Sequence, residues 1–355
     1  MSGSGRRLKV LYLYAGTRRW YYQDYLNGKV PDTRLLGLNH LKKWGIDAEF
    51  LEIPLAQWLR KINFNLVHLP YLPYLRKYDA VFLGAGFPLV YLARVVLRWK
   101  RPALILFNTS YGNLLRRNAG GPAHRFILAA LGGADAIVCV SSAQKEDLVK
   151  CGLAPERVHF LPLGVDASRI PPEGPDEGYV LSVGRDLARD YRTLFEAAKE
   201  LPMPIRVVTS PKNVAGLAPS ANVRLDFDLP YEQIPQLYQK ASMVVVPVRA
   251  ADYLAGSDAS GQYGYLEPMA YGKAVIVSDR PGARDYISPG GDGILVPPED
   301  PAALRKAILE LWRFPEERKH LGEAARRKVE KEFSTVRFAQ RLAELFYQLV
   351  ERRNP

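Results

Sequence analysis

The sequence predicts an α/β protein with two parallel sheets, each covered by helices. Short apolar runs alternate with helical patterns along most of the 355 residues, which is typical of βα units. Residues 171–178 are rich in proline, glycine and acid, so they are typical of a linker between two such series. We therefore expect two facing Rossmann-like domains, over residues 1–170 and 171–334. Their ligand should lie at the carboxyl ends of the strands, in a cleft between them.

Each domain is expected to contain six short apolar strands. They cover residues 8–14, 48–53, 78–83, 103–107, 136–140 and 159–161, then 179–183, 205–209, 223–227, 243–248, 274–277 and 293–296. Helical patterns cover about 32–44 and 88–99, and the second places Leu89, Leu92, Val96 and Leu97 on one apolar face. After Pro301 the chain is helical, with one helix over 316–333 and another from Ser334 onwards.

The net charge of +12 comes from the first half of the chain. Residues 1–170 hold 24 Lys and Arg against 11 Asp and Glu (+13), whereas residues 171–355 hold 25 against 26 (−1). No apolar run approaches the roughly 20 residues that span a bilayer. Two cysteines, Cys139 and Cys151, cannot form a disulfide framework, which fits a reducing cytoplasm. We expect a cytoplasmic protein, peripheral on the inner face of a membrane if its basic half binds lipid.

Aromatic residues stand among the basic residues of this half. Two such groups are Arg18, Arg19 and Trp20, and Arg98, Trp99 and Lys100. Three interpretations stay open: a solvated rim over core aromatics, an anionic membrane surface with rings at the headgroup level, or single-stranded nucleic acid held by stacking. We expect no nucleic-acid partner, and we place the two groups on the membrane or acceptor side of the protein.

The most informative segment covers residues 264–287. A glycine-bearing loop meets a short helix that is expected to open with Glu267, followed by a buried strand and a second glycine turn. A helix N-terminus suits a diphosphate, and a carboxylate beside it can accept hydrogen bonds from a ribose. The alternative is that Glu267 only complements the helix dipole.

A second informative segment covers residues 182–197. A strand ends at Gly184, and Arg185 and Arg189 stand four apart before a helix. The planar guanidinium binds phosphate oxygens in a bidentate manner, so the pair predicts a diphosphate clamp. The alternative is two surface arginines paired with Asp186 and Asp190.

These segments resemble the nucleotide-contacting regions of the GT-B glycosyltransferases, especially the retaining family 4, also called glycosyl transferases group 1. Glu267 matches the second Glu of that family's motif, and residues 269–276 match the remainder of the motif. Arg185 matches the Arg of the family's Gly-Arg…Lys motif, with Arg189 in the Lys position. Ala259 stands where the family has its first Glu, which touches the donor sugar. The resemblance covers most of residues 130–345.

The resemblance implies a GT-B fold whose last helix, about 335–355, crosses back to the first domain. It implies transfer from a nucleotide-diphosphate sugar, such as a UDP- or GDP-sugar, to a glycan or lipid-linked acceptor, with retention and without metal or cofactor. Catalytic roles fall to Arg185, Arg189 and Glu267. Expected donor contacts are Gly16, Gly184, Ser210, Asp258, Ser260, Gln262, Gly264, Tyr265 and Leu266.

Two departures keep other functions open. Beside Ala259, residues 108–111 read Asn-Thr-Ser-Tyr where many family members carry a histidine, so no catalytic histidine is expected. His124 is better explained as a structural residue at a helix start. The alternatives are a non-catalytic nucleotide-sugar-binding protein of the same fold and a nucleotide-sugar epimerase.

Overall fold

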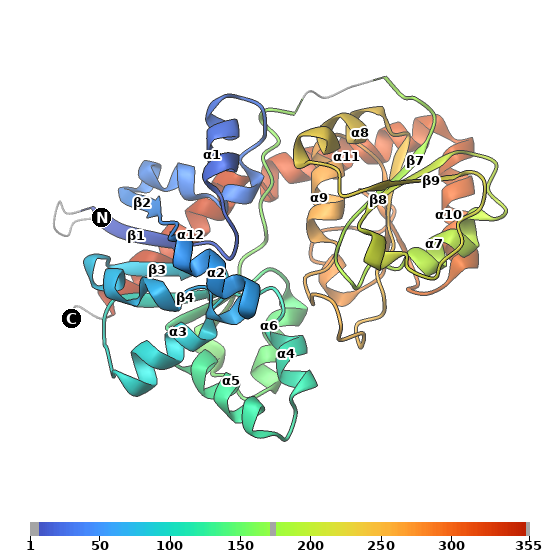
Figure 1. Cartoon of the computed structure of the whole chain (residues 1–355). Coiled ribbons are helices and arrows are strands. Elements are labelled where there is room, and N and C mark those ends of the chain that lie inside the picture. Colours follow the sequence, from blue (N-terminus) through green and yellow to red (C-terminus); the bar gives the residue numbers. More distant parts are fainter. Residues whose placement is uncertain (1–6, 171–174, 353–355) are drawn as a thin grey trace. The chain divides into compact units, whose positions relative to one another are not determined.

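The computed structural model describes residues 7–170 and 175–352. The chain divides into two compact units, Met1–Pro162 with Thr335–Pro355, and Leu163–Ser334. Each unit holds one six-stranded parallel sheet (Figure 1). The division falls at residue 162, whereas the sequence places the boundary at residue 170.

The first sheet has the strand order β2-β1-β3-β4-β5-β6. Its strands are β1 (Leu8–Leu13), β2 (Ile46–Phe50), β3 (Ala80–Leu83), β4 (Ala103–Phe107), β5 (Ala136–Cys139) and β6 (Val158–Phe160). The helices of this unit are α1 (Arg19–Leu26), η1 (Thr33–Leu35), η2 (Leu38–Trp44), α2 (Pro54–Ile62), η3 (Phe64–Leu66), η4 (Leu69–Lys77), α3 (Phe87–Tyr91), η5 (Leu92–Val96), α4 (Tyr111–Arg117), α5 (Pro122–Gly132), α6 (Ser142–Lys150), η6 (Pro155–Arg157) and α12 (Thr335–Glu351).

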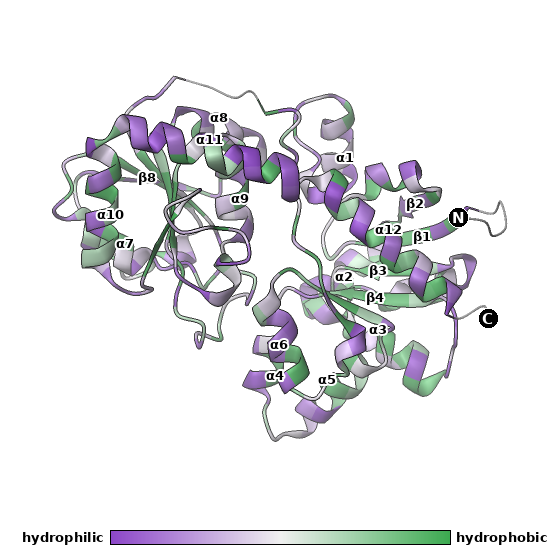
Figure 2. Ribbon diagram, turned by 180° about the vertical axis from the view of Figure 1, so that it is seen from behind, coloured by the Kyte–Doolittle hydropathy of each residue, from purple (hydrophilic) through white to green (hydrophobic). Residues whose placement is uncertain are grey.

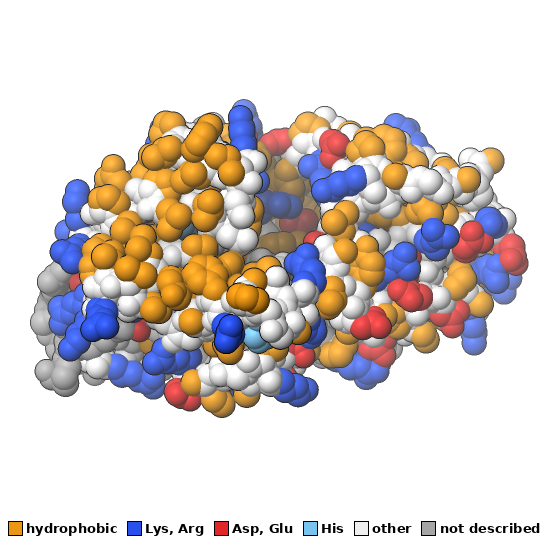
Figure 3. Space-filling model, turned by 60° about the horizontal axis from the view of Figure 1, so that its bottom comes forward, with side chains coloured by type: hydrophobic (Ala, Val, Ile, Leu, Met, Phe, Trp, Pro, Cys, Tyr) orange, Lys and Arg blue, Asp and Glu red, His pale blue; other side chains and the backbone are white. Residues whose placement is uncertain are grey.

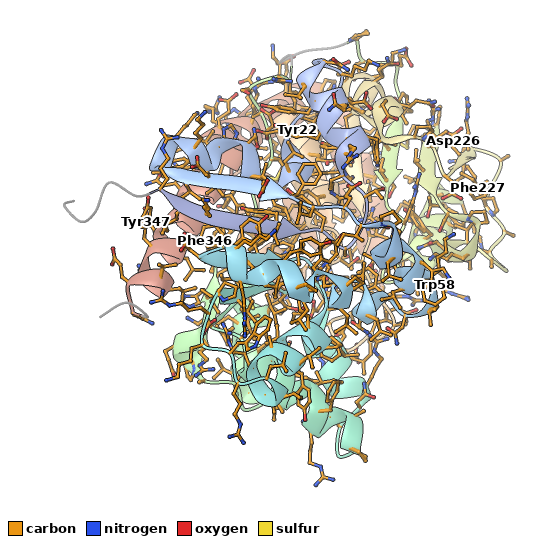
Figure 4. The ribbon with its side chains drawn as sticks, turned by 60° about the vertical axis from the view of Figure 1, so that its left-hand side comes forward. Tyr22, Trp58, Asp226, Phe227, Phe346 and Tyr347 are labelled. Carbon is orange, nitrogen blue, oxygen red and sulfur yellow. The ribbon has the colours of Figure 1, made fainter. Side chains whose placement is uncertain are left out.

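Helices cover both faces of this sheet. On one face α2, η4, α3 and α5 join the strands in a single buried core. On the other, Phe346 of α12 meets Phe82 of β3 edge to face, with ring centroids 6.4 Å apart, and Phe338 meets Phe107 in the same way. Figure 4 labels Phe346 on α12. The last helix therefore belongs to the first unit, as expected from the resemblance.

The second sheet has the order β12-β11-β10-β7-β8-β9. Its strands are β7 (Val180–Val183), β8 (Ile205–Thr209), β9 (Val223–Phe227), β10 (Met243–Val246), β11 (Val275–Ser278) and β12 (Ile294–Val296). The helices of this unit are α7 (Tyr191–Ala198), η7 (Pro211–Asn213), η8 (Tyr231–Gln233), α8 (Ile234–Lys240), α9 (Gln262–Ala270), η9 (Pro281–Ala283), α10 (Pro301–Arg313) and α11 (Pro315–Glu332). The central strands of both sheets, such as β4 and β10, are buried along their length, and β8 is mostly hydrophobic (Figure 2).

The strand orders identify where each sheet can bind a ligand. The chain runs outward from β1 to β2 and then continues on the other side of β1 with β3. In the second sheet the same reversal separates β7 from β10. Open α/β sheets bind ligands at the carboxyl ends of the strands that flank such a switch point. The segments that come directly after β1, β3, β7 and β10 are therefore the ones to inspect.

Two helix predictions are corrected by the structure. The helix expected over 32–44 is two 3-10 helices, η1 and η2, separated by Leu36 and Gly37, which both have positive φ. A methyl group on Gly37 would lie 2.8 Å from Cβ of Ala339, so the close approach of α12 requires glycine there.

The helix expected over 88–99 ends as an α-helix at Tyr91 and continues as the π-helix η5. The amide of Leu97 donates to Leu92 O over 2.9 Å, a spacing of five residues. This wider turn changes the register of the helix after Tyr91. Leu89 is buried as predicted, but Val96 and Leu97 are exposed rather than part of the core.

Candidate functional site

Arg189 lies beside the switch point of the second sheet, after β7. Its side chain is only 4% exposed, and Nη2 donates to Ser182 Oγ over 3.2 Å. Among the described residues, Nε and Nη1 have no hydrogen-bond partner. A methyl group on Gly184 would lie 2.5 Å from Nε, so glycine is needed to make room for the guanidinium. Buried charges are normally paired, which makes this arginine a candidate receptor for an anion.

The first turn of α9 stands on the other side of that guanidinium. A methyl group on Gly264 would lie 3.2 Å from Nη1 of Arg189. Gly261, with φ of 93°, is the N-cap, and the leading amides of a helix carry partial positive charge. Ser260 precedes the cap, and its buried Oγ also has no partner within the described part of the chain. The structure thus brings Gly184 and Gly264 against the guanidinium of Arg189, with Ser260 just before the helix cap, an arrangement that could receive an anion.

Glu267 does not open the helix, which corrects the sequence-based prediction. The helix begins at Gln262, so Glu267 is its sixth residue and lies in the second turn. The misleading signal is Pro268, because proline usually marks the first turn of a helix, whereas here it lies inside one. The Glu267 carboxylate is 6% exposed and accepts a hydrogen bond from the hydroxyl of Tyr231 over 3.0 Å. Burial, together with the Glu267 charge, raises the pKa of Tyr271.

Arg185 is placed differently from Arg189. Its half-exposed side chain lies against the segment after β9, where Nη2 donates to Leu229 O over 2.5 Å and Nε lies 3.5 Å from Asp228 Oδ1. The alternative pairing with Asp186 and Asp190 is not seen. Asp186 accepts from the amides of Ala188 and Ser257, and Asp190 caps α7 by accepting from Thr193.

The other expected donor contacts of this unit lie in three places. Asp258 and Gln262 stand at the start of α9, and Gln262 is buried. Ser210 directly follows β8 and donates to Asn213 Oδ1 over 2.6 Å. The side chains of Tyr265 and Leu266 are buried in the unit, so only their main chain could reach a donor. The Tyr265 amide already donates to Gly261 O.

In the first unit, Gly16 follows β1 at that sheet's switch point. A methyl group placed on it would lie 3.6 Å from Nη1 of Arg60 and 3.7 Å from Nη1 of Arg18. The amides of Arg18 and Arg19, at the start of α1, both donate to Glu52 Oε1, the second over 2.9 Å. An internal carboxylate therefore occupies the N-terminus of α1, while two guanidinium groups converge on the Gly16 loop.

The two groups of basic and aromatic residues in the first unit, 18–20 and 98–100, differ in exposure. Trp20 is 45% exposed, and Arg98 and Lys100 are exposed. Trp99 instead packs against the core and lies 4.2 Å below the guanidinium of Arg76. Trp99 therefore matches the interpretation as a core aromatic residue.

Sequence reasoning missed His68, which is fully buried at the switch point of the first sheet. Nδ1 lies 2.7 Å from Ala85 O and Nε2 lies 3.3 Å from Tyr14 O, so the ring joins the segments after β3 and β1. Burial lowers its pKa to about 4, although both carbonyl contacts act in the opposite direction. No local pattern marks this histidine, because both contacts are to main-chain carbonyls of distant segments.

Asn108 is the first of residues 108–111, which stand where many family members have a histidine. It is buried, and its Oδ1 accepts from the Tyr111 amide over 2.8 Å at the start of α4.

His124 lies in the first turn of α5, with Nδ1 3.1 Å from Leu115 O, a structural contact. Asp226, labelled in Figure 4, is held by Arg206 and Arg224. Within residues 7–170 and 175–352, no three His, Cys, Asp or Glu side chains gather as a metal site requires.

Comparison with known families supplies the identification. Residues 39–169 match the family described as Glycosyltransferase Family 4, and residues 167–328 match Glycosyl transferases group 1. The chain belongs to these glycosyltransferases. The second match contains Arg185, Arg189 and Glu267.

Individual proteins that are similar to this chain are also glycosyltransferases or share their fold. Alpha-maltose-1-phosphate synthase of Mycolicibacterium smegmatis is 26% identical over 61% of this glycosyltransferase chain and 64% of its own length, so the match spans less than two thirds of that relative. Sucrose-phosphate synthase from Thermosynechococcus elongatus has a TM-score of 0.69 at 18% identity, covering 98% of this chain and 100% of that one. Anabaena HepE, solved with UDP and glucose, has a TM-score of 0.70 at 14% identity, covering 96% and 100%. These similarities show the GT-B fold.

Proposed function

We propose that this chain transfers a sugar from a nucleotide-diphosphate sugar to an acceptor hydroxyl, with retention and without a metal. The observation that carries the proposal is the buried Arg189, whose Nε and Nη1 lack partners among the described residues beside the first turn of α9. A diphosphate would neutralise that charge and meet the helix amides. A UDP-sugar is the first donor to test, because HepE was solved with UDP and glucose.

The chemistry would be electrostatic. The bond between the anomeric carbon and the diphosphate oxygen breaks, and the acceptor oxygen bonds to the same face of the sugar. The acceptor proton passes to the departing diphosphate. Arg189 and the α9 N-terminus stabilise the charge that develops on the leaving oxygen, and Arg185 could add to it by leaving Asp228. Glu267, held by Tyr231, would accept hydrogen bonds from the ribose.

The acceptor in this proposal is a glycan, lipid-linked or at a membrane edge, which the chain would meet as a peripheral protein on a cytoplasmic membrane face. The basic excess of the first 170 residues supports this choice, since anionic lipids attract Lys and Arg. Among the described helices, none combines the length and apolar character that crossing a bilayer requires.

A non-catalytic nucleotide-sugar-binding protein is the second candidate. Ala259 in place of the family's first Glu favours it, as does the absence of histidine from residues 108–111, where the Asn108 side chain accepts from the Tyr111 amide. Donor turnover separates the two functions, and dependence of turnover on an acceptor separates a transferase from an epimerase.

The test is a thermal-shift panel of UDP, GDP and ADP with their sugar conjugates, on wild type, Arg189→Met and Arg192→Met. A ligand that binds only the folded state raises its melting temperature. Arg192 is an exposed arginine of α7 and serves as the matched control. We expect a selective shift with one diphosphate in wild type and in Arg192→Met.

Arg189→Met should lose the shift while its own melting temperature stays equal or rises, because methionine removes a buried unpaired charge. A wild type that no diphosphate stabilises, or an Arg189→Met protein that keeps the shift, would refute the site.

A further inference from the structure

We propose that the outer face of the first unit binds the surface of an anionic lipid bilayer, with α2 lying in the interface. The outer face consists of Leu55, Trp58 and Ile62 of α2, Phe64 of η3, and Val95 and Val96 of η5. This inference rests on the proposed function, because membrane binding would bring the first unit to a lipid-linked acceptor. Vesicle binding is measured without turnover, so the two proposals can fail separately.

Helix α2 has apolar residues on the side that faces solvent. Leu55, Trp58 and Ile62 are three and four residues apart, so they lie on one side of the helix. They are 53%, 57% and 61% exposed. The side toward the core carries Ala56, which is fully buried. A surface helix of a soluble protein normally turns its polar side outward, so an apolar outer side indicates a partner.

The π-helix η5 adds to the same side of the unit. The wider turn after Tyr91 brings Val95 and Val96 to the surface, where they are 42% and 56% exposed. Both α2 and η5 pack on the core cluster that covers one face of the sheet, through Ala56 and Ala93. Figure 3 shows hydrophobic side chains gathered over the part of the molecule that carries this unit, with Lys and Arg among them.

The charge of this segment selects an anionic partner. Residues 54–101 contain eight Lys and Arg and a single acid, Asp79, which gives +7, or +6 once Arg94 is set against its partner Asp135. Arg60 and Lys61 are exposed on α2 itself. A second copy of the chain would bring two such surfaces together, and their like charges would repel. Anionic headgroups attract these cations while Trp58 and the aliphatic residues enter the acyl boundary.

The experiment is flotation of the full chain with vesicles, at low salt, of phosphatidylcholine alone or with one third phosphatidylglycerol. Three proteins are compared: wild type, Trp58→Ser with Ile62→Ser, and Phe314→Ser. Phe314 lies in the second unit and is 57% exposed, as Trp58 is, so it controls for loss of exposed apolar surface. A second pair compares Arg60→Glu with Lys61→Glu against Arg313→Glu with Lys319→Glu, all exposed positions.

We expect wild type, Phe314→Ser and the Arg313/Lys319 variant to float with the anionic vesicles and to be released by high salt. The Trp58/Ile62 variant should partition roughly 10-fold or more weakly, because binding scales with buried apolar area. The Arg60/Lys61 variant should lose a similar factor on anionic vesicles only.

Three results would overturn the proposal. The first is wild type that stays with the soluble fraction at low salt. The second is a control variant that weakens binding as much as its matched α2 variant. The third is a wild-type dimer, seen by sedimentation and dissociated by the Trp58/Ile62 changes, which would assign the face to self-association.

Discussion

At the scale of single residues, Arg189 and His68 are two buried basic side chains that differ in charge: Arg189 is positively charged and His68 is neutral. Arg189 cannot lose its proton, and its Nε and Nη1 lack hydrogen-bond partners within the described chain, so we propose that a bound anion supplies the missing partners. His68 stays neutral because burial lowers its pKa to about 4. The first arrangement is typical of a ligand site and the second of a structural cross-link.

His68 predicts a pH dependence of stability. Between about pH 6.5 and pH 4 the unfolded chain binds a proton at His68 that the folded chain does not. The free energy of unfolding should therefore fall as the pH falls through this window, by about 3 kcal/mol from this residue. Denaturant unfolding at several pH values should show a flatter dependence for His68→Gln than for wild type. His320→Gln, an exposed histidine of α11, should keep the wild-type slope. Equal slopes in all three proteins would contradict the prediction.

The proposed role of Glu267 predicts that its substitution weakens nucleoside binding whether or not the ligand carries a phosphate. If its carboxylate binds ribose hydroxyls, Glu267→Gln should weaken uridine and UDP alike, by roughly 10-fold, the size of a hydrogen bond to a charged group. Titration calorimetry measures both ligands. Glu232→Gln, a carboxylate beside Tyr231, should change neither. Weakening of UDP alone would move Glu267 from the ribose to the diphosphate.

At the scale of elements, all six strands of each sheet could be predicted from the sequence, because most are short apolar runs between turns. The strand expected over 48–53 lies at 46–50, where Asp47 and Glu49 interrupt the apolar pattern.

Helices were harder to predict from the sequence where local signals conflict with the packing. Pro268 mimics a helix start, and Gly37 breaks a helical pattern. After the π-turn, Val96 and Leu97 are exposed rather than buried. Arg189 and Glu267 could be proposed as site residues from the sequence because their motifs are local, whereas the contacts of His68 come from two distant segments.

The last helix predicts a strong effect of a single core residue. Phe346 is fully buried against Phe82, so Phe346→Ala should cost about 3–5 kcal/mol and lower the melting temperature of the first unit by roughly 10 °C. Gln348→Ala, at an exposed position of the same helix, should be nearly silent. Thermal unfolding followed by circular dichroism compares the two. Equal melting temperatures would show that α12 is not needed for that core.

At the scale of the whole molecule, the charge and the candidate chemistry lie in different units. Every residue of the candidate anion site belongs to Leu163–Ser334, whereas the basic excess belongs to the first unit. The resemblance proposed residues of the candidate site through local motifs. It could not reveal the apolar outer side of α2, which depends on how that helix packs on the sheet.

This separation predicts that ligand and mutation act on different unfolding transitions. In scanning calorimetry UDP should raise the transition of the second unit, because a ligand stabilises the part that it binds. Phe346→Ala should lower the other transition. A ligand shift confined to the transition that Phe346→Ala lowers would place the nucleotide in the first unit.

The most direct test of the central claim is a calorimetric titration of UDP and uridine into wild type, Arg189→Met and Arg192→Met. If Arg189 and the start of α9 hold the diphosphate, wild type and Arg192→Met should bind UDP at least ~10-fold more tightly than uridine. Arg189→Met should bind the two almost equally, with its affinity for uridine unchanged. An Arg189→Met protein that keeps the full preference for UDP would contradict the account.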